Sequence, residues 1–281
     1  MTIRKGRFFL VAEAPWILLT NDDGIDSPVL DPLIDQLSSI AEVRTVVPDS
    51  ECSWTGKIMS RFSPVALGQA ERGGRRVWTL GGYPADCANI GVHTLFATPP
   101  ALVVSGINMG TNAGLAFFLS SGTIGAAVEG FLAGVPALAF SLELPKEDFA
   151  LWRRERRLEA HTERLLANAA AAARSITEEV WRGGLPSGAA LMTVNMPTTT
   201  DRDTPRRFTG ITRTAYGSIF ARHPDGDRFE YDFSGLQIMD DAGDAVALQN
   251  QEMALTPVRF ALDVEPTDED RTRFERLPTA S

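Results

Sequence analysis

The chain has 281 residues, of which 44% are hydrophobic and 22% are charged, and this balance excludes disorder over the whole length. Its formal net charge of −9 argues against a protein that binds nucleic acid polymers, because such proteins need a basic surface to displace counterions. A small phosphorylated ligand is compatible with an acidic chain, since a metal ion or a helix terminus can hold an anion locally.

No targeting or membrane-spanning segment is predicted. Two cysteines, Cys52 and Cys87, are too few for a disulfide framework, and a cytoplasmic location fits them. Residues 1–15 begin with basic residues and an apolar run like those of a signal peptide, but a glutamate and a proline interrupt the pattern. We interpret these residues as an N-terminal extension. The apolar stretch 123–142 also contains a glutamate and a proline, so no membrane partner is expected.

The first half of the chain alternates apolar strands with amphipathic helices. The run Trp16–Thr20 predicts a strand, leucines and isoleucines at helical spacing predict a helix over Ser27–Ile40, and Val43–Val47 predicts a second strand. A right-handed crossover would place the two strands side by side in a parallel sheet. The same alternation continues with a helix over Pro84–Phe96, a strand at Ala101–Val104, a helix over Gly122–Leu132 and a strand at Ala137–Phe140. The sequence therefore predicts an α/β fold.

The character of the sequence changes beyond residue 145. The run Leu151–Trp181 lacks proline and glycine and predicts a single long helix, which a strand at Leu191–Val194 follows. Residues Arg206–Asp263 alternate β-branched or aromatic runs with Gly and Asp turns, which is typical of β-hairpins, and a frayed end is expected from Pro266. The chain thus divides into an extension over 1–15, an α/β core over 16–200 and a C-terminal β-rich segment with its tail over 201–281.

Two neighbouring carboxylates follow the first predicted strand, in the loop Asn21-Asp22-Asp23-Gly24. Open parallel sheets bind their ligands beyond the carboxyl ends of the strands, which is where this loop would lie. Gly24 permits a turn in which both carboxylates converge, and like charges held together favour a hard divalent cation between them. The alternative is that Asn21 or Asp22 caps the next helix while Asp23 is solvated.

Two further polar loops follow predicted strands. The loop 48–57 offers the hydroxyls of Ser50 and Ser53, although a cluster of this composition is also typical of an ordinary loop. The glycine-rich loop 105–114 contains Asn108, which would give a metal a neutral oxygen ligand. This loop lacks the G-x-G-x-x-G spacing of dinucleotide-binding proteins, which argues against a nicotinamide cofactor.

The segment Ser121-Gly122-Thr123 stands at the start of a predicted helix. Hydroxyls and free N–H groups at a helix N-terminus form an anion site, or else the serine is a plain N-cap. The joint occurrence of four polar segments at the ends of strands favours the functional interpretation. A metal held by oxygen ligands alone would be Mg²⁺ or Mn²⁺ rather than Zn²⁺, and the candidate ligands are Asp22, Asp23, Ser53 and Asn108.

Four blocks of the sequence resemble the signature motifs of the stationary-phase survival protein SurE family, and they occur in the family's order. The blocks are Ile17–Ile25, Pro84-Ala85-Asp86-Cys87, Val104–Asn112 and Ser121–Gly130. Any one block would be weak evidence, but the ordered set is highly specific. It covers roughly residues 16–142, and weaker similarity continues towards residue 257.

The resemblance implies a metal-dependent phosphomonoesterase of the 5′-nucleotidase type, which hydrolyses nucleoside monophosphates. It implies a Rossmann-like, mostly parallel sheet flanked by helices, with a C-terminal β segment used in a homodimer or homotetramer. It also implies one divalent cation, Mg²⁺ or Mn²⁺, in each subunit. The residues expected from the family at the metal are Asp22, Asp23, Ser53, with Ser50 as its alternative, and Asn108. The residues expected around the phosphate are Asn21, Asn112, Ser121, Gly122 and Thr123. Asp22 and Asp23 are also the expected catalytic residues.

Two departures from the family pattern bear on the substrate. Tyr83 stands where the family usually has Thr or Ser, and Leu115–Leu119 is apolar where relatives commonly have polar residues. The apolar run would form core, an oligomer contact or a pocket for an apolar leaving group, and we favour core. The alternative functions are a non-catalytic or substrate-shifted nucleotide- or phosphate-binding protein, and an oligomeric scaffold held together by the tail.

Overall fold

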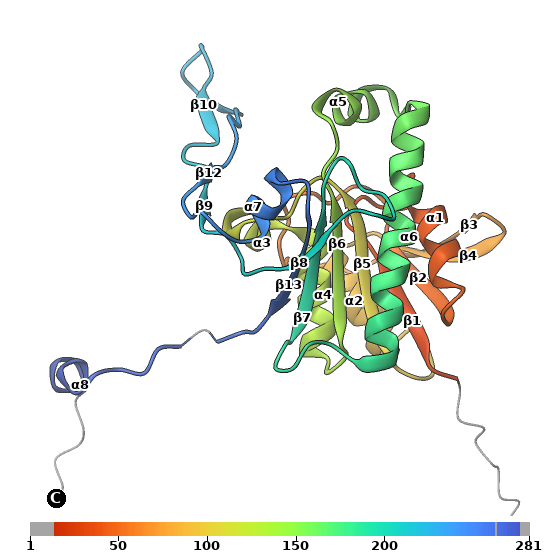
Figure 1. The fold of residues 1–281 in the computed structure, drawn as a ribbon, viewed down its shortest axis with the longest axis horizontal. Coiled ribbons are helices and arrows are strands. Elements are labelled where there is room, and N and C mark those ends of the chain that lie inside the picture. Colours follow the sequence, from red (N-terminus) through yellow and green to blue (C-terminus); the bar gives the residue numbers. More distant parts are fainter. Residues whose placement is uncertain (1–13, 262, 276–281) are drawn as a thin grey trace, which may run out of the picture.

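A computed structural model describes residues 14–261 and 263–275, so the predicted N-terminal extension lies almost entirely outside the described residues. The described helices (Figure 1) are α1 (Leu30–Leu37), α2 (Pro84–His93), α3 (Leu115–Ser120), α4 (Gly122–Leu132), α5 (Lys146–Glu155), α6 (Ala160–Gly183), α7 (Asp244–Gln249) and α8 (Asp268–Phe274). The strands of the central sheet are β1 (Trp16–Thr20), β2 (Glu42–Pro48), β3 (Leu67–Arg72), β4 (Arg75–Leu80), β5 (Leu102–Met109), β6 (Ala137–Leu142), β7 (Leu191–Met196), β8 (Arg206–Phe208) and β13 (Met253–Val258). Two small hairpins contain β9 (Thr214–Ala215), β10 (Phe220–Arg222), β11 (Phe229–Tyr231) and β12 (Gln237–Ile238).

The central sheet has the strand order β3-β4-β2-β1-β5-β6-β7-β13-β8. Its neighbouring strands are parallel except in two pairs, β3 with β4 and β7 with β13. Helices cover both faces (Figure 1). The predicted α/β fold with a mostly parallel sheet is therefore confirmed, although the β3–β4 hairpin and the short helix α3 were not predicted.

The two faces of the sheet bury alternate side chains of β1. Ile17 and Leu19 belong to the apolar cluster that α1 and α6 cover, whereas Trp16 and Leu18 belong to the cluster that α2 and α4 cover. This alternation follows from the two-residue repeat of a strand. A strand buried on both faces has no polar side, which explains the continuous apolar run in the sequence.

The connection order reverses beside β1, and this reversal places the polar loops together. The chain passes from β1 through α1 to β2 on one side, and later returns to form β5 on the other side. Thr20 at the end of β1 pairs with Ser105 of β5. In open parallel sheets such a switch point is where ligands bind, so the loops after β1 and β5 have the predicted location.

The structure corrects the end of β5. The sequence predicted a strand that stops at Val104, but β5 continues to Met109 with a register irregularity between Ser105 and Asn108. Gly106 makes this possible, because its φ is +121° and a Cβ atom there would lie 2.3 Å from the carbonyl oxygen of Phe140. Asn108 therefore projects from the sheet rather than from a free loop.

The single helix predicted over Leu151–Trp181 is wrong, because the segment forms two helices. Helix α5 ends at Glu155, Arg156 adopts a left-handed conformation with φ 53°, and α6 begins at Ala160. The charged residues at the break are exposed, so no buried face holds them in a continuous helix. His161 of α6 contacts Asp148 of α5 at 2.8 Å and closes the corner.

The C-terminal region is less uniform than the hairpins predicted for it. Strands β8 and β13 extend the central sheet, and the segment between them carries the two hairpins, which project from the body as one arm (Figure 1), followed by α7. The frayed end expected from Pro266 is also corrected, because α8 occupies Asp268–Phe274. The Thr267 side chain caps this helix by accepting the Asp270 N–H at 3.1 Å.

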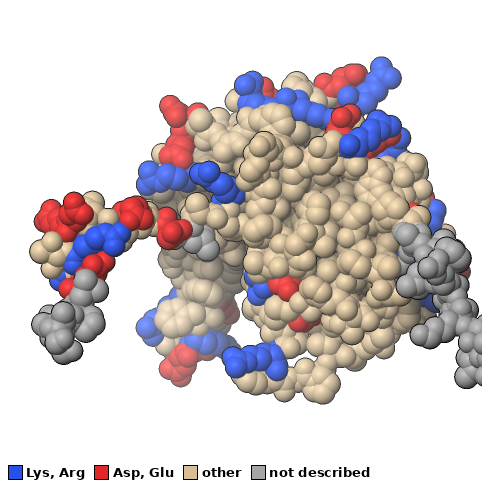
Figure 2. Space-filling model, turned by 90° about the horizontal axis from the view of Figure 1, so that it is seen from below, with Lys and Arg blue, Asp and Glu red and all other residues tan. Residues whose placement is uncertain are grey.

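The end of the sheet remote from α5 carries few charged side chains. Seen from below (Figure 2), Lys, Arg, Asp and Glu lie mostly around the rim of the molecule. The connecting segments 97–101, 133–136 and 184–190 contain none of these residues. Among the described residues, no helix has the length and apolar composition needed to cross a membrane.

Gly125 of α4 holds the loop after β2 against the core. A Cβ atom at Gly125 would lie 2.2 Å from the carbonyl oxygen of Gly56, which is a backbone atom that cannot rotate away. We expect Gly125→Ala to lower the free energy of unfolding by about 2 kcal/mol or more, because overpacking forces the backbone apart. Urea denaturation measures this difference.

Gly183 provides the matched control, because it is also helical and has no atom within 4 Å of the position of a Cβ. Gly183→Ala is expected to be neutral or to stabilise by up to about 1 kcal/mol. Equal losses in both variants would show that the contact between α4 and the loop is unimportant for stability.

Candidate active site

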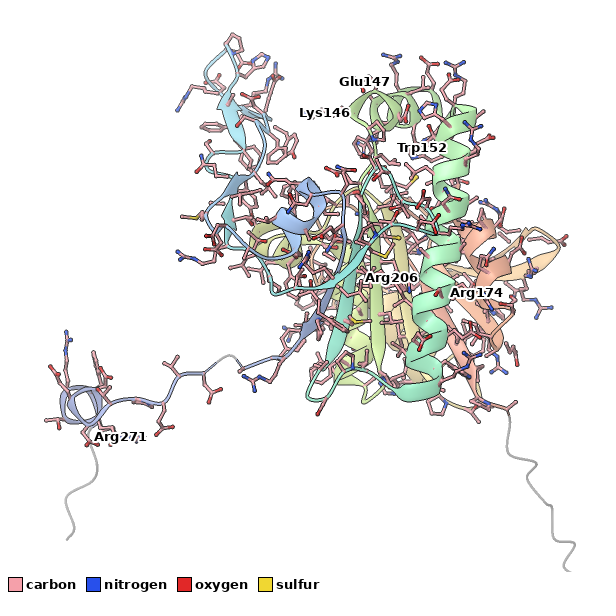
Figure 3. All side chains as sticks on the ribbon, in the orientation of Figure 1. Lys146, Glu147, Trp152, Arg174, Arg206 and Arg271 are labelled. Atoms are coloured by element: carbon pink, nitrogen blue, oxygen red, sulfur yellow. The ribbon has the colours of Figure 1, made fainter. Side chains whose placement is uncertain are left out.

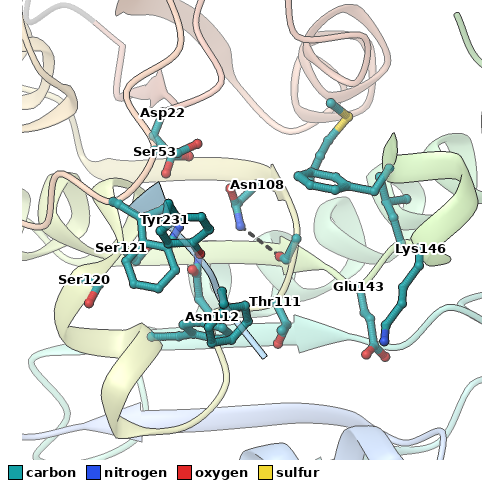
Figure 4. A pocket seen from close by; sticks show the side chains of 17 residues that line it. Asp22, Ser53, Asn108, Thr111, Asn112, Ser120, Ser121, Glu143, Lys146 and Tyr231 are labelled. Carbon is teal, nitrogen blue, oxygen red and sulfur yellow. Dashed lines mark hydrogen bonds between the residues drawn. The ribbon is translucent and has the colours of Figure 1, made fainter. Parts of the chain in front are cut away.

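A cavity of about 420 Å³ opens at the carboxyl ends of β1 and β5. Figure 4 shows Asp22, Ser53 and Asn108 together on one side of it, and Glu143 with Lys146 at the other end. Helix α5, which carries Lys146 and Trp152, lies above this edge of the sheet (Figure 3). The cavity is lined by five of the residues predicted from the sequence, namely Asp22, Ser53, Asn108, Asn112 and Ser121.

Asp22 is a buried carboxylate held at the start of α4. The Thr123 hydroxyl donates a hydrogen bond to Oδ1 of this carboxylate. Burial raises the pKa of Asp22 from 3.8 to about 6, although the hydrogen bonds from Thr123 oppose this rise. Thr123 was expected near the phosphate, and the structure shows it positioning Asp22.

Asp23 joins the loop after β1 to the end of β5. Its Oδ2 accepts the backbone N–H of Met109 at 3.1 Å. Burial raises its pKa well above the ordinary value, and the neighbouring charge of Asp22 raises it further. The two carboxylates therefore repel each other in an environment that a cation would stabilise.

The turn that presents both carboxylates depends on Asn21 and Gly24. Asn21 donates its side-chain N–H to the carbonyl oxygen of Gly24 at 3.0 Å and accepts the Gly24 N–H at 3.1 Å. Gly24 has φ +80°, and a Cβ atom there would lie 2.8 Å from the carbonyl carbon of Ser50. Asn21 thus braces the turn and is not among the residues that line the cavity.

Ser53 and Asn108 bring neutral oxygens to the same side of the cavity. Ser53 is exposed and its hydroxyl donates to Glu51 at 2.8 Å. Asn108 donates its amide N–H to the carbonyl oxygen of Gly110 at 2.8 Å, so the amide oxygen faces the other way, on the side of Asp22 (Figure 4). Ser50, the alternative to Ser53, donates to Asp49 and does not line the cavity.

The N-terminus of α4 also lies at the cavity. Ser121 caps the helix by accepting the Ile124 N–H at 3.1 Å. Gly122 follows it, and a Cβ atom there would lie 2.9 Å from the Thr55 hydroxyl and 3.0 Å from the Asp22 Cβ. Free N–H groups and the helix dipole at this position favour an anion such as a phosphate. Asn112 is buried nearby and donates to the Ser141 hydroxyl at 2.7 Å.

An ion pair and a hydrogen bond on Glu129 anchor the loop after β2. Glu129 of α4 is buried and accepts hydrogen bonds from Asn89 of α2 at 2.7 Å. It also pairs with Lys57 at 2.6 Å. Lys57 follows Ser53 closely in the chain, so this network fixes the loop that carries the serine.

Sequence reasoning missed the aromatic residues of the cavity, Trp54, Phe117, Phe149, Tyr231 and Phe233. The unusual apolar run Leu115–Leu119 was a signal for one of them, Phe117. Of that run, Phe118 is buried as core, Phe117 lines the cavity, and Leu115 and Leu119 are exposed. Tyr83, the other departure from the family pattern, is the N-cap residue of α2 and does not line the cavity.

The donor set fits a hard divalent cation. Among the described residues, no three His, Cys, Asp or Glu side chains gather into a cluster that could hold a metal. A site at Asp22 and Asp23 must therefore be completed by neutral oxygens, which Ser53 and Asn108 can supply. Two carboxylates with hydroxyl, amide and water oxygens are ligands that Mg²⁺ and Mn²⁺ accept.

A model of the family described as Survival protein SurE matches residues 17–218. The chain belongs to the SurE family. It is 32% identical to the 5′-nucleotidase SurE of Methanocella arvoryzae over 87% of this chain and 91% of that protein. It is 34% identical to the 5′-nucleotidase SurE of Syntrophotalea carbinolica over 88% of this chain and 92% of that protein. The predicted family is thereby confirmed.

The fold also matches a solved structure of the family. The crystal structure of the SurE protein from Aquifex aeolicus superposes with a TM-score of 0.71 at 26% sequence identity. The match covers 92% of this chain and 97% of that chain. The agreement extends beyond residue 200, so the SurE-like structure includes most of the C-terminal segment.

The raised pKa of Asp23 predicts that this carboxylate destabilises the metal-free protein. The charged form is favoured in the unfolded chain, so the carboxylate costs stability as pH rises through its folded pKa, and costs nothing well below 3.8. With a chelator at pH 8, we expect Asp23→Asn to raise the melting temperature by roughly 2–8 °C. The gain should be much smaller at pH 4, close to the ordinary pKa of 3.8, and differential scanning calorimetry at the two pH values measures it.

Addition of Mn²⁺ should reverse the order of stability, because the metal stabilises only the protein that binds it. Asp26→Asn is the matched control, since Asp26 is an exposed carboxylate of the same loop. A similar gain in Asp26→Asn, or equal stabilisation of wild type and Asp23→Asn by Mn²⁺, would contradict this account.

Proposed function

We propose that this protein is a metal-dependent phosphomonoesterase of the 5′-nucleotidase type, which releases phosphate from nucleoside monophosphates. The observation that carries the proposal is the pair Asp22 and Asp23, held at the end of β1 beside the N-terminus of α4 and the cavity. A cation site and an anion site adjoin there, which is what a metal-bound phosphate requires. The relatives named 5′-nucleotidase SurE support the same reaction class.

The proposed cofactor is one Mg²⁺ or Mn²⁺ per subunit, held by Asp22, Asp23, Ser53 and Asn108. When bound, such an ion neutralises phosphoryl oxygens and lowers the pKa of a water molecule or orients it for attack. Thr123 keeps Asp22 in place through its hydrogen bond. The backbone N–H of Met109 donates to Oδ2 of Asp23. The other oxygen, Oδ1, would then hold the ion or accept a proton from the attacking water.

The phosphate would lie between the carboxylate loop and the start of α4. The N–H groups at Gly122 and the capping Ser121 would stabilise the charge that develops on the phosphoryl oxygens. Asn112 would complete the wall of this subsite, and Thr123 and Asn21 would support it from behind. The cavity would then hold the nucleoside as the leaving group.

We propose a homodimer or homotetramer in which the C-terminal segment 201–281 takes part, because the arm exposes the large apolar side chains Phe220, Phe229 and Met239. A cytoplasmic location accords with two free cysteines among the described residues, Cys52 and Cys87.

The proposal predicts metal-dependent release of phosphate. After chelation and dialysis, wild-type protein should release phosphate from nucleoside monophosphates only when Mn²⁺ or Mg²⁺ is returned. Asp22→Ala and Asp23→Ala should lower kcat/KM by about 100-fold or more, because they remove ligands of the ion. A colorimetric phosphate assay measures the rates.

Asp26→Ala serves as the control for substitution in the same loop. Wild-type binding of nucleotide without turnover would instead favour the alternative, a non-catalytic or substrate-shifted member of the family. Full activity of Asp22→Ala would refute the proposed site.

The two candidate serines can be separated by metal affinity. Ser53→Ala should weaken Mn²⁺ binding about tenfold or more, whereas Ser50→Ala should change it less than about twofold. Isothermal titration calorimetry of both variants decides between them. A larger loss in Ser50→Ala would assign the ligand to Ser50.

A further inference from the structure

The cavity has a polar end and an aromatic wall beside it. One end contains the proposed metal and phosphate residues, Asp22, Asn108 and Ser121. The adjoining wall is aromatic, with Trp54 and Phe117 from the core and Tyr231 and Phe233 from the arm. A leaving group attached to a phosphate at the polar end must therefore extend along aromatic rings.

Trp54 links the polar end to the aromatic wall, because it directly follows Ser53 in the chain. Its φ of 61° lies in the left-handed region, where a bulky residue is a clear outlier. Such strain persists only where the surroundings fix it, and it is concentrated at functional sites. The conformation turns the indole ring towards the arm, where it contacts Phe117, Tyr231 and Phe233 at centroid distances of 5.6, 5.9 and 6.1 Å.

The aromatic cluster is not a sealed core. Trp54 is 42% exposed and Tyr231 is 56% exposed, yet both line the cavity. Rings that served only to pack the arm on the body would bury these surfaces. The open faces are available to a ligand.

The arm is tied in place where it leaves the body. Asp244 is buried and accepts the N–H groups of Gly114 at 3.0 Å and Thr212 at 2.9 Å. Thr214 accepts the Ala116 N–H at 3.0 Å. These bonds join the base of the arm to α3, which carries Phe117, so the two halves of the aromatic wall are positioned together.

We infer that Trp54, with Tyr231 and Phe233 of the arm, forms a stacking wall that selects phosphate monoesters whose leaving group carries a planar aromatic ring, such as a nucleoside, over aliphatic ones. The inference rests on the proposed function and names the substrate determinant of the same cavity. Stacking accepts every base, because each presents a π-face. The wall therefore discriminates aromatic from aliphatic leaving groups more than one base from another.

The test compares adenosine 5′-monophosphate with ribose 5-phosphate, which keeps the sugar and phosphate and lacks the base. Trp54→Asn removes the ring and retains a residue that tolerates a positive φ. We expect the ratio of kcat/KM for the two substrates to fall about tenfold in Trp54→Asn, and to be largely restored in Trp54→Phe. Phe62→Ala is the control, because Phe62 is an exposed ring of the segment that follows Trp54 and does not line the cavity.

Binding of adenosine to the chelated protein gives a second readout, independent of phosphate release. Calorimetry should show roughly tenfold weaker binding in Trp54→Asn and in the double variant Tyr231→Ala/Phe233→Ala, and wild-type binding in Phe62→Ala. An unchanged substrate ratio with active wild-type enzyme would overturn the inference and leave the proposed function intact. If wild-type protein released no phosphate from either substrate, the proposed function would fail, and adenosine binding alone would decide whether the aromatic wall binds bases.

Discussion

Two adjacent carboxylates at the end of the central strand are the constraint on which the rest of the site depends. Folding removes Asp22 from water and holds Asp23 beside it, so their mutual repulsion must be offset by hydrogen bonds or by a cation. The protein supplies hydrogen bonds to both, from Thr123 to Asp22 and from the Met109 N–H to Asp23. Thr123 lies in α4 and Met109 in β5, so the charge pair also joins the loop after β1 to these two elements.

The part of the site that the sequence predicts consists of residues whose chemistry is unusual for their position. Two carboxylates placed together after a buried strand cost folding free energy unless a cation or hydrogen bonds offset their charge. Where two backbones pass closely, few residues other than glycine fit. Both features can therefore be recognised in the sequence. Gly24, Gly106 and Gly122 each stand where a Cβ atom would collide with a neighbouring segment. The metal ligands inferred from this pattern line one cavity in the structure, with the exception of Asp23, which braces it from the side of β5.

The aromatic wall could not be predicted in the same way. Trp54, Phe117 and Tyr231 lie far apart in the chain, and an isolated aromatic residue in a loop or a hairpin predicts packing equally well. Their convergence depends on where the arm lies, which is set by Asp244 and Thr214 rather than by any local pattern. The break between α5 and α6 was missed for a related reason, because helix propensity over residues 151–181 does not reveal which side chains find a surface to cover.

The arm begins and ends on neighbouring strands. Strands β8 and β13 are parallel, and Phe208, where the chain leaves the sheet, pairs with Leu255, just after the chain returns to it. The chain therefore leaves and rejoins the sheet at one place on its edge, and the strands do not set the length or sequence of the segment between. Insertions, deletions and substitutions in the arm can accumulate without disturbing the strands that position the carboxylates. Under the proposed function and the proposed aromatic wall, the range of leaving groups would thus diverge between relatives while the chemistry at the phosphate stays the same, because the two functions would lie in parts of the chain that tolerate change to different degrees.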